Sequence, residues 1–508
     1  MIRPIVTALL VAATGWASAQ DRPAEEELFG TPSTEASPPK EQPGTAKEAP
    51  PAKPTPGTAP ASGETHGDHP AAEAELFGTQ ASPASPPPAP GRMVTREQED
   101  PLKLGGFVYL RSAITWYEGD SVGDGGLSLP NLVDLFLDAR PNDRVRAFAL
   151  ARTFWDPTGG GRSPARDALV ENGLAPAPDT RPQSVLDQLW LNFDLYHQVY
   201  VTAGKQHVKW GVGKFWNPTD YLHPVKRDPL AVFDARTGVT MVKAHWPWES
   251  KGWNVYGVAL LEQAGRRQTV DTIGSVGGGG RAEVVLGPAE LGVDALAQQG
   301  TKPRFGVDLS AGVWDLDLYT ELAIRTEQDS TKYRLVDPGA PIEIRYVPYQ
   351  PEGWQPQLVV GGGWAWKYND EDVLNVGVEY FWNEPGYSDP AVYPFLLLQT
   401  AADPTTRAFT PFYLGKQYLG VSLNLPAPGR WNDTIFTLSW IGNLSDRSYT
   451  VRLDHSTLCL TYLRVETYVS VYGGTKGGEF RLALDYPEPV GYLPPAVLSA
   501  GVALRVNL

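Results

Sequence analysis

Cysteine is almost absent from this chain of 508 residues, which holds only Cys459. A single cysteine excludes an intramolecular disulfide and any cysteine-rich metal site. After the first residues, no run of about 18 apolar residues occurs, so we expect no transmembrane helix. Positive charge is also in short supply, because 43 Lys and Arg face 58 Asp and Glu and the net charge is -15. We therefore expect no nucleic acid among the partners.

The N-terminus has the pattern of a targeting segment. Arg3 supplies a positive charge, Ile5 to Ala13 form a short apolar core, and Ala17-Ser18-Ala19 are small residues typical of a cleavage site. We expect residues 1–19 to be a signal peptide, with the mature chain beginning at Gln20 and exported from the cytoplasm.

Residues 20–98 are rich in Pro, Ala, Glu, Ser and Thr and nearly devoid of Val, Ile and aromatic residues. Such a segment cannot bury enough apolar surface to offset its ordering entropy, so we expect a disordered periplasmic arm. One pattern occurs twice in it, as Glu-Leu-Phe-Gly-Thr at 27–31 and 75–79. Two copies of an apolar pair suggest docking to a periplasmic or envelope partner, with duplication that carries no function as the alternative. The docking residues would be Leu28, Phe29, Leu76 and Phe77.

From about residue 99 the chain changes to strands in which apolar and polar residues alternate. Leu189, Leu191, Phe193 and Leu195, for example, lie opposite Gln188, Asn192 and Asp194. Short links alternate with long ones along the chain, and Trp and Tyr cluster near the strand ends. This combination predicts an all-β fold, a transmembrane antiparallel β-barrel of about 16–18 strands spanning residues 99–508, with short periplasmic turns and long external loops.

One segment carries a more specific signal. Gly204-Lys205-Gln206 and Trp210-Gly211 are followed by Phe215-Trp216-Asn217-Pro218-Thr219-Asp220. This segment, with the signal peptide and the strand series, resembles Gram-negative outer-membrane porins and porin-like proteins of uncharacterised function. The resemblance implies a passive channel for small hydrophilic solutes, in contact with outer-membrane lipids and lipopolysaccharide. One departure is that the chain ends in Leu508, whereas porins usually end in an aromatic residue.

In porins one external loop commonly folds into the channel, and the resemblance implies this for residues 211–236. The loop is too apolar for a free external loop, and prolines stiffen it. A ring of cations in a constricted lumen would favour anions, but the same cations could instead form a solvated cluster facing lipopolysaccharide phosphates. The expected constriction and selectivity residues are Lys205, His207, Lys209, Lys214, Phe215, Trp216, Asp220, Lys226, Arg227, Arg236 and Lys243.

The strand before this loop presents a conflict, because Val199, Val201 and Ala203 share their face with Lys205, His207 and Lys209. Either a β-bulge at Gly204 reverses the face, which we prefer, or the lysines lie above the hydrocarbon band.

Three further hypotheses concern a metal site, a hydrolase site and the role of Cys459. His207, His223 and His245 match no compact metal site, and the acidic segment 118–124 lacks a full calcium-loop pattern, so we expect no metal or cofactor. Asp454-His455-Ser456 is the only compact cluster suited to a hydrolase, but neighbours in a strand point to opposite faces, so we expect no enzyme. Cys459 we expect to be structural, either buried or facing lipid.

Overall fold

The computed structural model describes residues 101–161, 179–223, 225–234, 236–262, 275–299, 301–326, 330–340, 342–369, 372–402, 407–485 and 491–508. Residues 1–100 lie outside this range. The expected signal peptide, the arm and the docking residues Leu28, Phe29, Leu76 and Phe77 therefore remain predictions.

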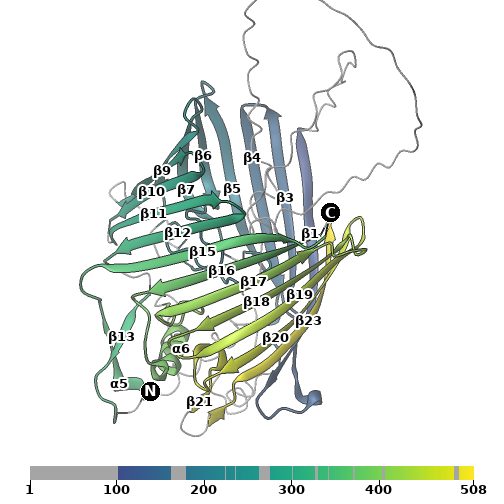
Figure 1. Ribbon diagram of the computed structural model, residues 1–508, viewed down its shortest axis with the longest axis vertical. Helices are drawn as coiled ribbons and strands as arrows, with labels where there is room; N and C mark the ends of the chain where they lie inside the picture. Colours follow the sequence, from purple (N-terminus) through teal and green to yellow (C-terminus); the bar gives the residue numbers. More distant parts are fainter. Residues whose placement is uncertain are drawn as a thin grey trace, which may run out of the picture.

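Eighteen antiparallel strands close into one barrel (Figure 1). Each strand pairs with the next one along the wall, and β23 returns to pair with β1, from Phe107 opposite Asn507 to Tyr117 opposite Ala496. The prediction of an all-β barrel with 16–18 strands is thus confirmed. The barrel strands are β1 (Leu102–Tyr117), β3 (Asn131–Asn142), β4 (Val145–Trp155), β5 (Gln183–Leu195), β6 (Val199–Gln206), β7 (Val239–Trp248), β8 (Trp253–Leu260), β9 (Gly277–Leu286), β10 (Ala289–Gln298), β11 (Thr301–Val313), β12 (Leu316–Arg325), β15 (Gln355–Lys367), β16 (Val373–Asn383), β17 (Gln417–Pro426), β18 (Thr434–Asn443), β19 (Ser448–Leu460), β20 (Leu463–Gly474) and β23 (Ala496–Asn507).

The remaining elements are short and belong to the connections. In Figure 1, β13, α5, α6 and β21 gather at the end of the barrel opposite the C-terminus. No helix among the described residues is long and apolar enough to cross a membrane. These elements are η2 (Val122–Asp124), β2 (Gly126–Ser128), β13 (Lys332–Leu335), α5 (Ile342–Arg345), β14 (Tyr346–Tyr349), η4 (Pro390–Val392), α6 (Tyr393–Ala402), η6 (Glu479–Arg481), β21 (Leu484–Asp485) and β22 (Tyr492–Leu493).

The connections alternate in length as expected. Tight turns join pairs such as β9–β10 and β19–β20 at one end, while the other end carries long connections such as 207–238 and 384–416. The turn between β11 and β12 lies at Trp314-Asp315. Trp314 has φ +56°, the backbone conformation that the turn needs, and the strands remain paired up to Val313 and Leu316.

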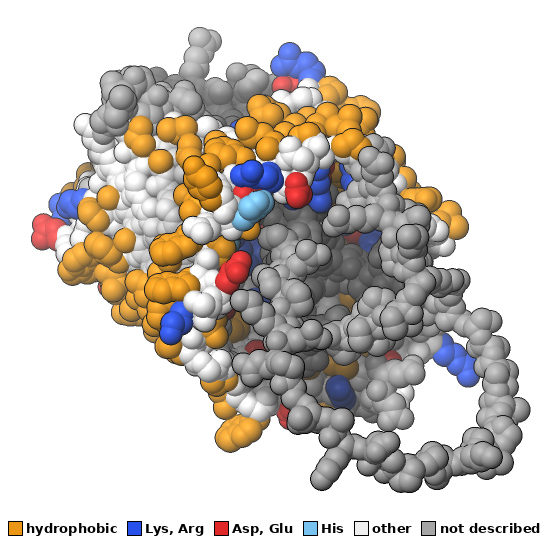
Figure 2. All heavy atoms as spheres, turned by 90° about the horizontal axis from the view of Figure 1, so that it is seen from above, with side chains coloured by type: hydrophobic (Ala, Val, Ile, Leu, Met, Phe, Trp, Pro, Cys, Tyr) orange, Lys and Arg blue, Asp and Glu red, His pale blue; other side chains and the backbone are white. Residues whose placement is uncertain are grey.

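The two faces of the wall differ in chemistry. Exposed aliphatic side chains point outward, and hydrophobic side chains cover much of the outside of the wall in Figure 2. Inward-facing side chains form ion pairs, such as Arg146–Asp138 at 2.8 Å and Arg281–Asp308 at 2.5 Å. An apolar exterior around a charged lumen suits a barrel surrounded by lipid. The outward side chains include Leu135, Leu189, Val293, Val307, Leu309, Val360, Val469 and Leu504.

Aromatic side chains lie at the tight-turn end of several strands. Trp246 and Trp248 stack with ring centroids 5.7 Å apart, and Trp364 and Trp366 stack at 6.1 Å; all four are more than 40% exposed. Amphipathic rings in this position match the interfacial belt of a membrane protein.

Candidate functional site

The connection between β6 and β7, residues 207–238, folds into the barrel; we call it the inner loop. Residues 224 and 235 within it lie outside the described part of the chain. Most of its large apolar side chains are buried, as the apolar character of the segment predicted, and Trp216 is fully buried. The buried aromatic and aliphatic residues are Val208, Trp210, Phe215, Trp216, Tyr221, Leu222 and Phe233.

Glu321, on the inward face of β12, holds the start of the loop. Its buried carboxylate accepts hydrogen bonds from the backbone N–H groups of Val212 (3.0 Å), Gly213 (2.9 Å) and Thr219 (2.7 Å), and from Thr219 Oγ1 (2.8 Å). Gly211 makes this close approach possible, because a Cβ there would lie 2.4 Å from Glu321 Oε2 and the residue has φ +89°. The glycine that seemed to break the strand therefore serves the contact with the wall.

Glu379, on β16, holds the next three residues in the same way. It accepts from the backbone N–H groups of Lys214 (2.7 Å), Phe215 (3.2 Å) and Trp216 (2.7 Å), and from the Tyr319 hydroxyl (2.7 Å). A buried carboxylate is costly unless hydrogen bonds compensate for its lost hydration. Among the described residues neither Glu321 nor Glu379 forms an ion pair, so the loop backbone and these hydroxyls supply that compensation.

Aromatic packing reinforces the two carboxylates. The Trp216 ring contacts both Phe381 and Tyr418, with centroids 5.5 Å away in each case, and Trp216 Nε1 donates to Phe412 O at 2.9 Å. Phe215 packs over Gly420 of β17, where a Cβ would come within 2.8 Å of its ring. The segment 211–219 is thereby fixed to the wall between β12 and β17.

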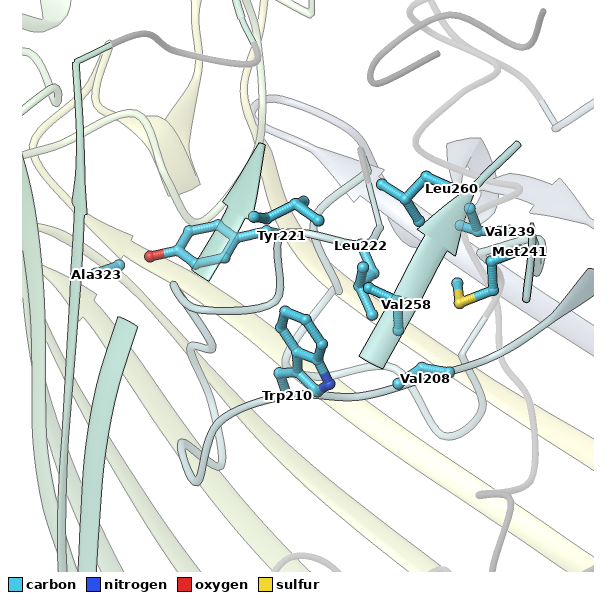
Figure 3. Packing of buried hydrophobic residues seen from close by; sticks show 10 residues of the cluster. Val208, Trp210, Tyr221, Leu222, Val239, Met241, Val258, Leu260 and Ala323 are labelled. Atoms are coloured by element: carbon cyan, nitrogen blue, oxygen red, sulfur yellow. The ribbon is translucent and has the colours of Figure 1, made fainter. Parts of the chain in front are cut away.

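A second cluster joins the loop to β7, β8 and β12. Trp210 lies near Leu222 and Val258, and the Tyr221 ring extends toward Ala323 (Figure 3). The Tyr221 hydroxyl donates to Phe305 O at 2.5 Å. Burial raises the pKa of Tyr221, so the hydroxyl keeps the proton that it donates.

The later part of the loop is held by side chains. Arg236 pairs with Asp220 at 2.6 Å and with Asp234 at 2.5 Å. Although burial lowers it, the two carboxylates hold the pKa of Arg236 above its usual value. Phe233 stacks on Phe107 of β1, with centroids 5.2 Å apart. The loop thus reaches from the β12–β17 wall across to β1.

The expectation of a bulge at Gly204 is wrong. The β5–β6 register runs without a shift from Leu195–Val199 to Leu189–Lys205, so Lys205 lies on the outward face and its ammonium donates to Leu186 O at 2.9 Å. The strand ends at Gln206, so His207 and Lys209 lie beyond it and only Lys205 shares the outward face with Val199, Val201 and Ala203. The extra residue belongs to β5, where the β4–β5 register skips Asp187 and leaves adjacent Asp187 and Gln188 both buried.

A small recess in the loop brings together seven of the eleven expected constriction residues. The other four lie elsewhere. Lys205 faces outward, Trp216 is buried in the aromatic cluster, and Lys243 lies on the inward face of β7 opposite Thr202. His207 stacks on His223 at 5.0 Å, 3.4 Å from Asp187. The seven in the recess are Lys209, Lys214, Phe215, Asp220, Lys226, Arg227 and Arg236.

The structure also shows where the candidate metal ligands, the candidate hydrolase residues and Cys459 lie. In the described part of the chain no three His, Cys, Asp or Glu side chains gather as metal ligands. His245 stacks on Tyr256, apart from the His207–His223 pair. His455 contacts Thr467 at 3.2 Å, whereas Ser456 accepts from Arg464 at 3.2 Å, so the two do not form a hydrolase dyad. Cys459 is exposed, which excludes a buried structural role.

Glu321 and Glu379 were not among the expected site residues. Their signal was present in the sequence, since each is a carboxylate on the polar face of an alternating strand. That pattern identifies a residue facing the lumen, but it does not show which loop the residue meets.

Comparison with known protein families and with curated proteins found no match. Several solved structures are similar in fold. OccAB1 of Acinetobacter baumannii aligns with a TM-score of 0.47 and 9% identity, over 80% of this chain and 96% of that one. A BenF-like porin from Pseudomonas fluorescens aligns with a TM-score of 0.46 and 10% identity, over 80% and 98%. OccK5 of Pseudomonas aeruginosa gives 0.44 and 8%, over 80% and 98%. The barrel itself is established by the strand pairing of this chain.

Proposed function

We propose that this protein is an outer-membrane channel for passive diffusion of small hydrophilic solutes, with a preference for anions. The observation that carries the proposal is the inner loop, which is fixed across a charged lumen by Glu321 and Glu379. A loop that narrows a water-filled barrel limits solute size, and its charge selects among the solutes that fit.

The sign of the preference follows from the side chains that the loop presents. Its recess carries five cationic side chains and one carboxylate, in a chain whose net charge is -15. Fixed positive charge at a constriction raises the local concentration of anions. The tight turns and the chain termini would face the periplasm, and the long connections the exterior.

Conductance of the refolded full-length chain in planar bilayers tests the proposal. We expect discrete current steps, and a reversal potential of the anion-favouring sign in a potassium chloride gradient. Absence of steps, under conditions in which a known porin inserts, would refute the channel. A reversal potential of the opposite sign would refute the anion preference and leave the channel standing.

A further inference from the structure

The recess in the inner loop is lined by more cationic than anionic side chains. It is lined by the cationic residues Lys209, Lys214, Lys226, Arg227 and Arg236 and by the carboxylate of Asp220, a formal excess of four positive charges. Asp220 and the nearby Asp234 both pair with Arg236. Asp220, the carboxylate that lines the recess, is therefore already paired with one of the five cations.

Two of the remaining cations have unused hydrogen-bonding capacity. Lys209 is exposed, and its ammonium makes no hydrogen bond or ion pair with any described residue. Arg227 Nε is buried from solvent and has no hydrogen-bond acceptor within the described part of the chain. A buried guanidinium N–H without an acceptor is costly, and an anionic ligand would supply the acceptor.

Two neutral donors line the same recess. Asn217 Nδ2 is buried and has no acceptor among the described residues. Tyr413 enters the recess from the connection between β16 and β17. Burial raises the pKa of Tyr413, so its hydroxyl keeps a proton to donate. An amide, a phenol, a guanidinium and an ammonium together match the several acceptor oxygens of an oxyanion.

We infer that this recess is a saturable binding site for a small oxyanion, a carboxylate or phosphate group, on the transport path. The inference rests on the proposed channel function and adds a defined ligand class to it. Charge alone would favour chloride as much as an oxyanion of equal charge. Donors at fixed positions discriminate between them, because chloride has no separate oxygens to occupy those positions.

Block of the chloride current by inorganic phosphate at pH 7, and separately by acetate, tests the site in the full-length channel. We expect block that saturates with phosphate concentration. Asn217→Asp is nearly isosteric and keeps the side-chain oxygen, but it replaces the amide donor by a carboxylate. It should raise the half-blocking concentration by roughly tenfold or more, the scale of one hydrogen bond to a charged group.

A second variant and a control separate a local effect from a general one. Lys209→Gln changes an exposed side chain that does not support the fold, and it should also weaken the block. Lys243→Gln removes an inward-facing cation outside the recess and should leave the half-blocking concentration unchanged. Block by both phosphate and acetate supports the oxyanion class, and block by phosphate alone restricts the ligand to phosphate.

Three results would overturn the site. They are block that rises without saturation, equal block in wild type and Asn217→Asp, and an equal effect of Lys243→Gln. If the chain forms no channel, the proposed function fails first. Equilibrium dialysis of phosphate against the purified full-length protein then tests the site alone, and absence of binding there would refute it.

Discussion

The two halves of the inner loop are attached to the barrel by different chemistry. In the first half, residues 211–219, backbone N–H groups donate to the buried carboxylates of Glu321 and Glu379. In the second half, residues 225–236 without residue 235, the Phe233 side chain packs on Phe107 of the wall, and Arg236 forms its ion pairs within the loop.

Because of this difference, backbone groups position the first half of the loop, while its side chains line the recess. Backbone attachment leaves the first half's polar side chains, such as Lys214 and Asn217, available to line the recess. In the second half, Arg236 forms ion pairs within the loop, and Arg227 lies beside the recess. The comparison predicts that the carboxylates on the wall control the position of the first half of the loop, whereas packing of Phe233 controls only the second half.

Replacing both wall carboxylates, by Glu321→Gln with Glu379→Gln, should have the largest effect. Each glutamine keeps one acceptor oxygen but turns an NH₂ group toward backbone donors, and a hydrogen bond to a charged group contributes about 1.5–3 kcal/mol. We expect residues 211–219 to lose protection from hydrogen exchange, and the single-channel conductance to rise and fluctuate.

The control for this pair is Glu290→Gln, which removes a carboxylate from the inward-facing side of β10 at a position that does not contact the inner loop. Its conductance and exchange protection should match wild type. Unchanged protection of residues 211–219 in the double variant would show that packing of Trp216 and Phe215 suffices to hold the first half.

Phe233→Ala tests the second half and should have a smaller effect on the channel. Phe233 is 1% exposed between Phe107 and Tyr109, and removing a buried phenylalanine side chain costs about 3–5 kcal/mol. We expect residues 225–234 to lose exchange protection while residues 211–219 keep theirs. Phe233→Leu should show a weaker form of the same pattern.

If residues 211–219 and 225–234 instead lose protection together in Phe233→Ala, the loop is one cooperative unit. The distinction between its halves would then concern contacts and not stability.

The wall of the barrel was predictable because each of its signals is local. Alternation with period two assigned Leu189 and Leu191 to the outward face, and turn residues separated the strands. The site was predictable only in part. The apolar content of 215–222 indicated an inward loop, but the contact of Thr219 with Glu321 joins residues 102 positions apart and depends on closure of the barrel.

The position of the β-bulge could also not be predicted from local sequence. The sequence showed that apolar residues 199–203 share a face with polar residues at 205–209. For His207 and Lys209 this conflict is only apparent, because the strand ends at Gln206, and alternation alone does not mark that end. The real bulge at Asp187 follows from the pairing of β5 with β4. Neighbouring residues cannot reveal which strand of a pair holds an extra residue, because that depends on the partner.

A third buried carboxylate, Glu479, lies in another connection. From it we expect an effect of pH on stability, which is the smallest of the three effects that we predict. Glu479 of η6 accepts from the Tyr418 hydroxyl at 2.6 Å, from Asn443 Nδ2 at 2.8 Å and from the Phe412 backbone N–H. Burial, with the charge of Asp446 nearby, raises the pKa of Glu479 to about 8.

Because the pKa of Glu479 is higher in the folded state than its ordinary value of 4.5, its protonated form is favoured by folding. This contribution to stability is fully present below about pH 4.5 and is lost as the pH rises through about 8. One such group changes the free energy of unfolding by at most about 1.4 kcal/mol per pH unit. The difference in Tm between wild type and Glu479→Gln, measured from pH 5 to pH 9, isolates it. We expect wild type to lose stability relative to the variant as the pH rises. A difference that does not change with pH would mean that Glu479 stays ionised when buried, held by its donors as a permanent anion.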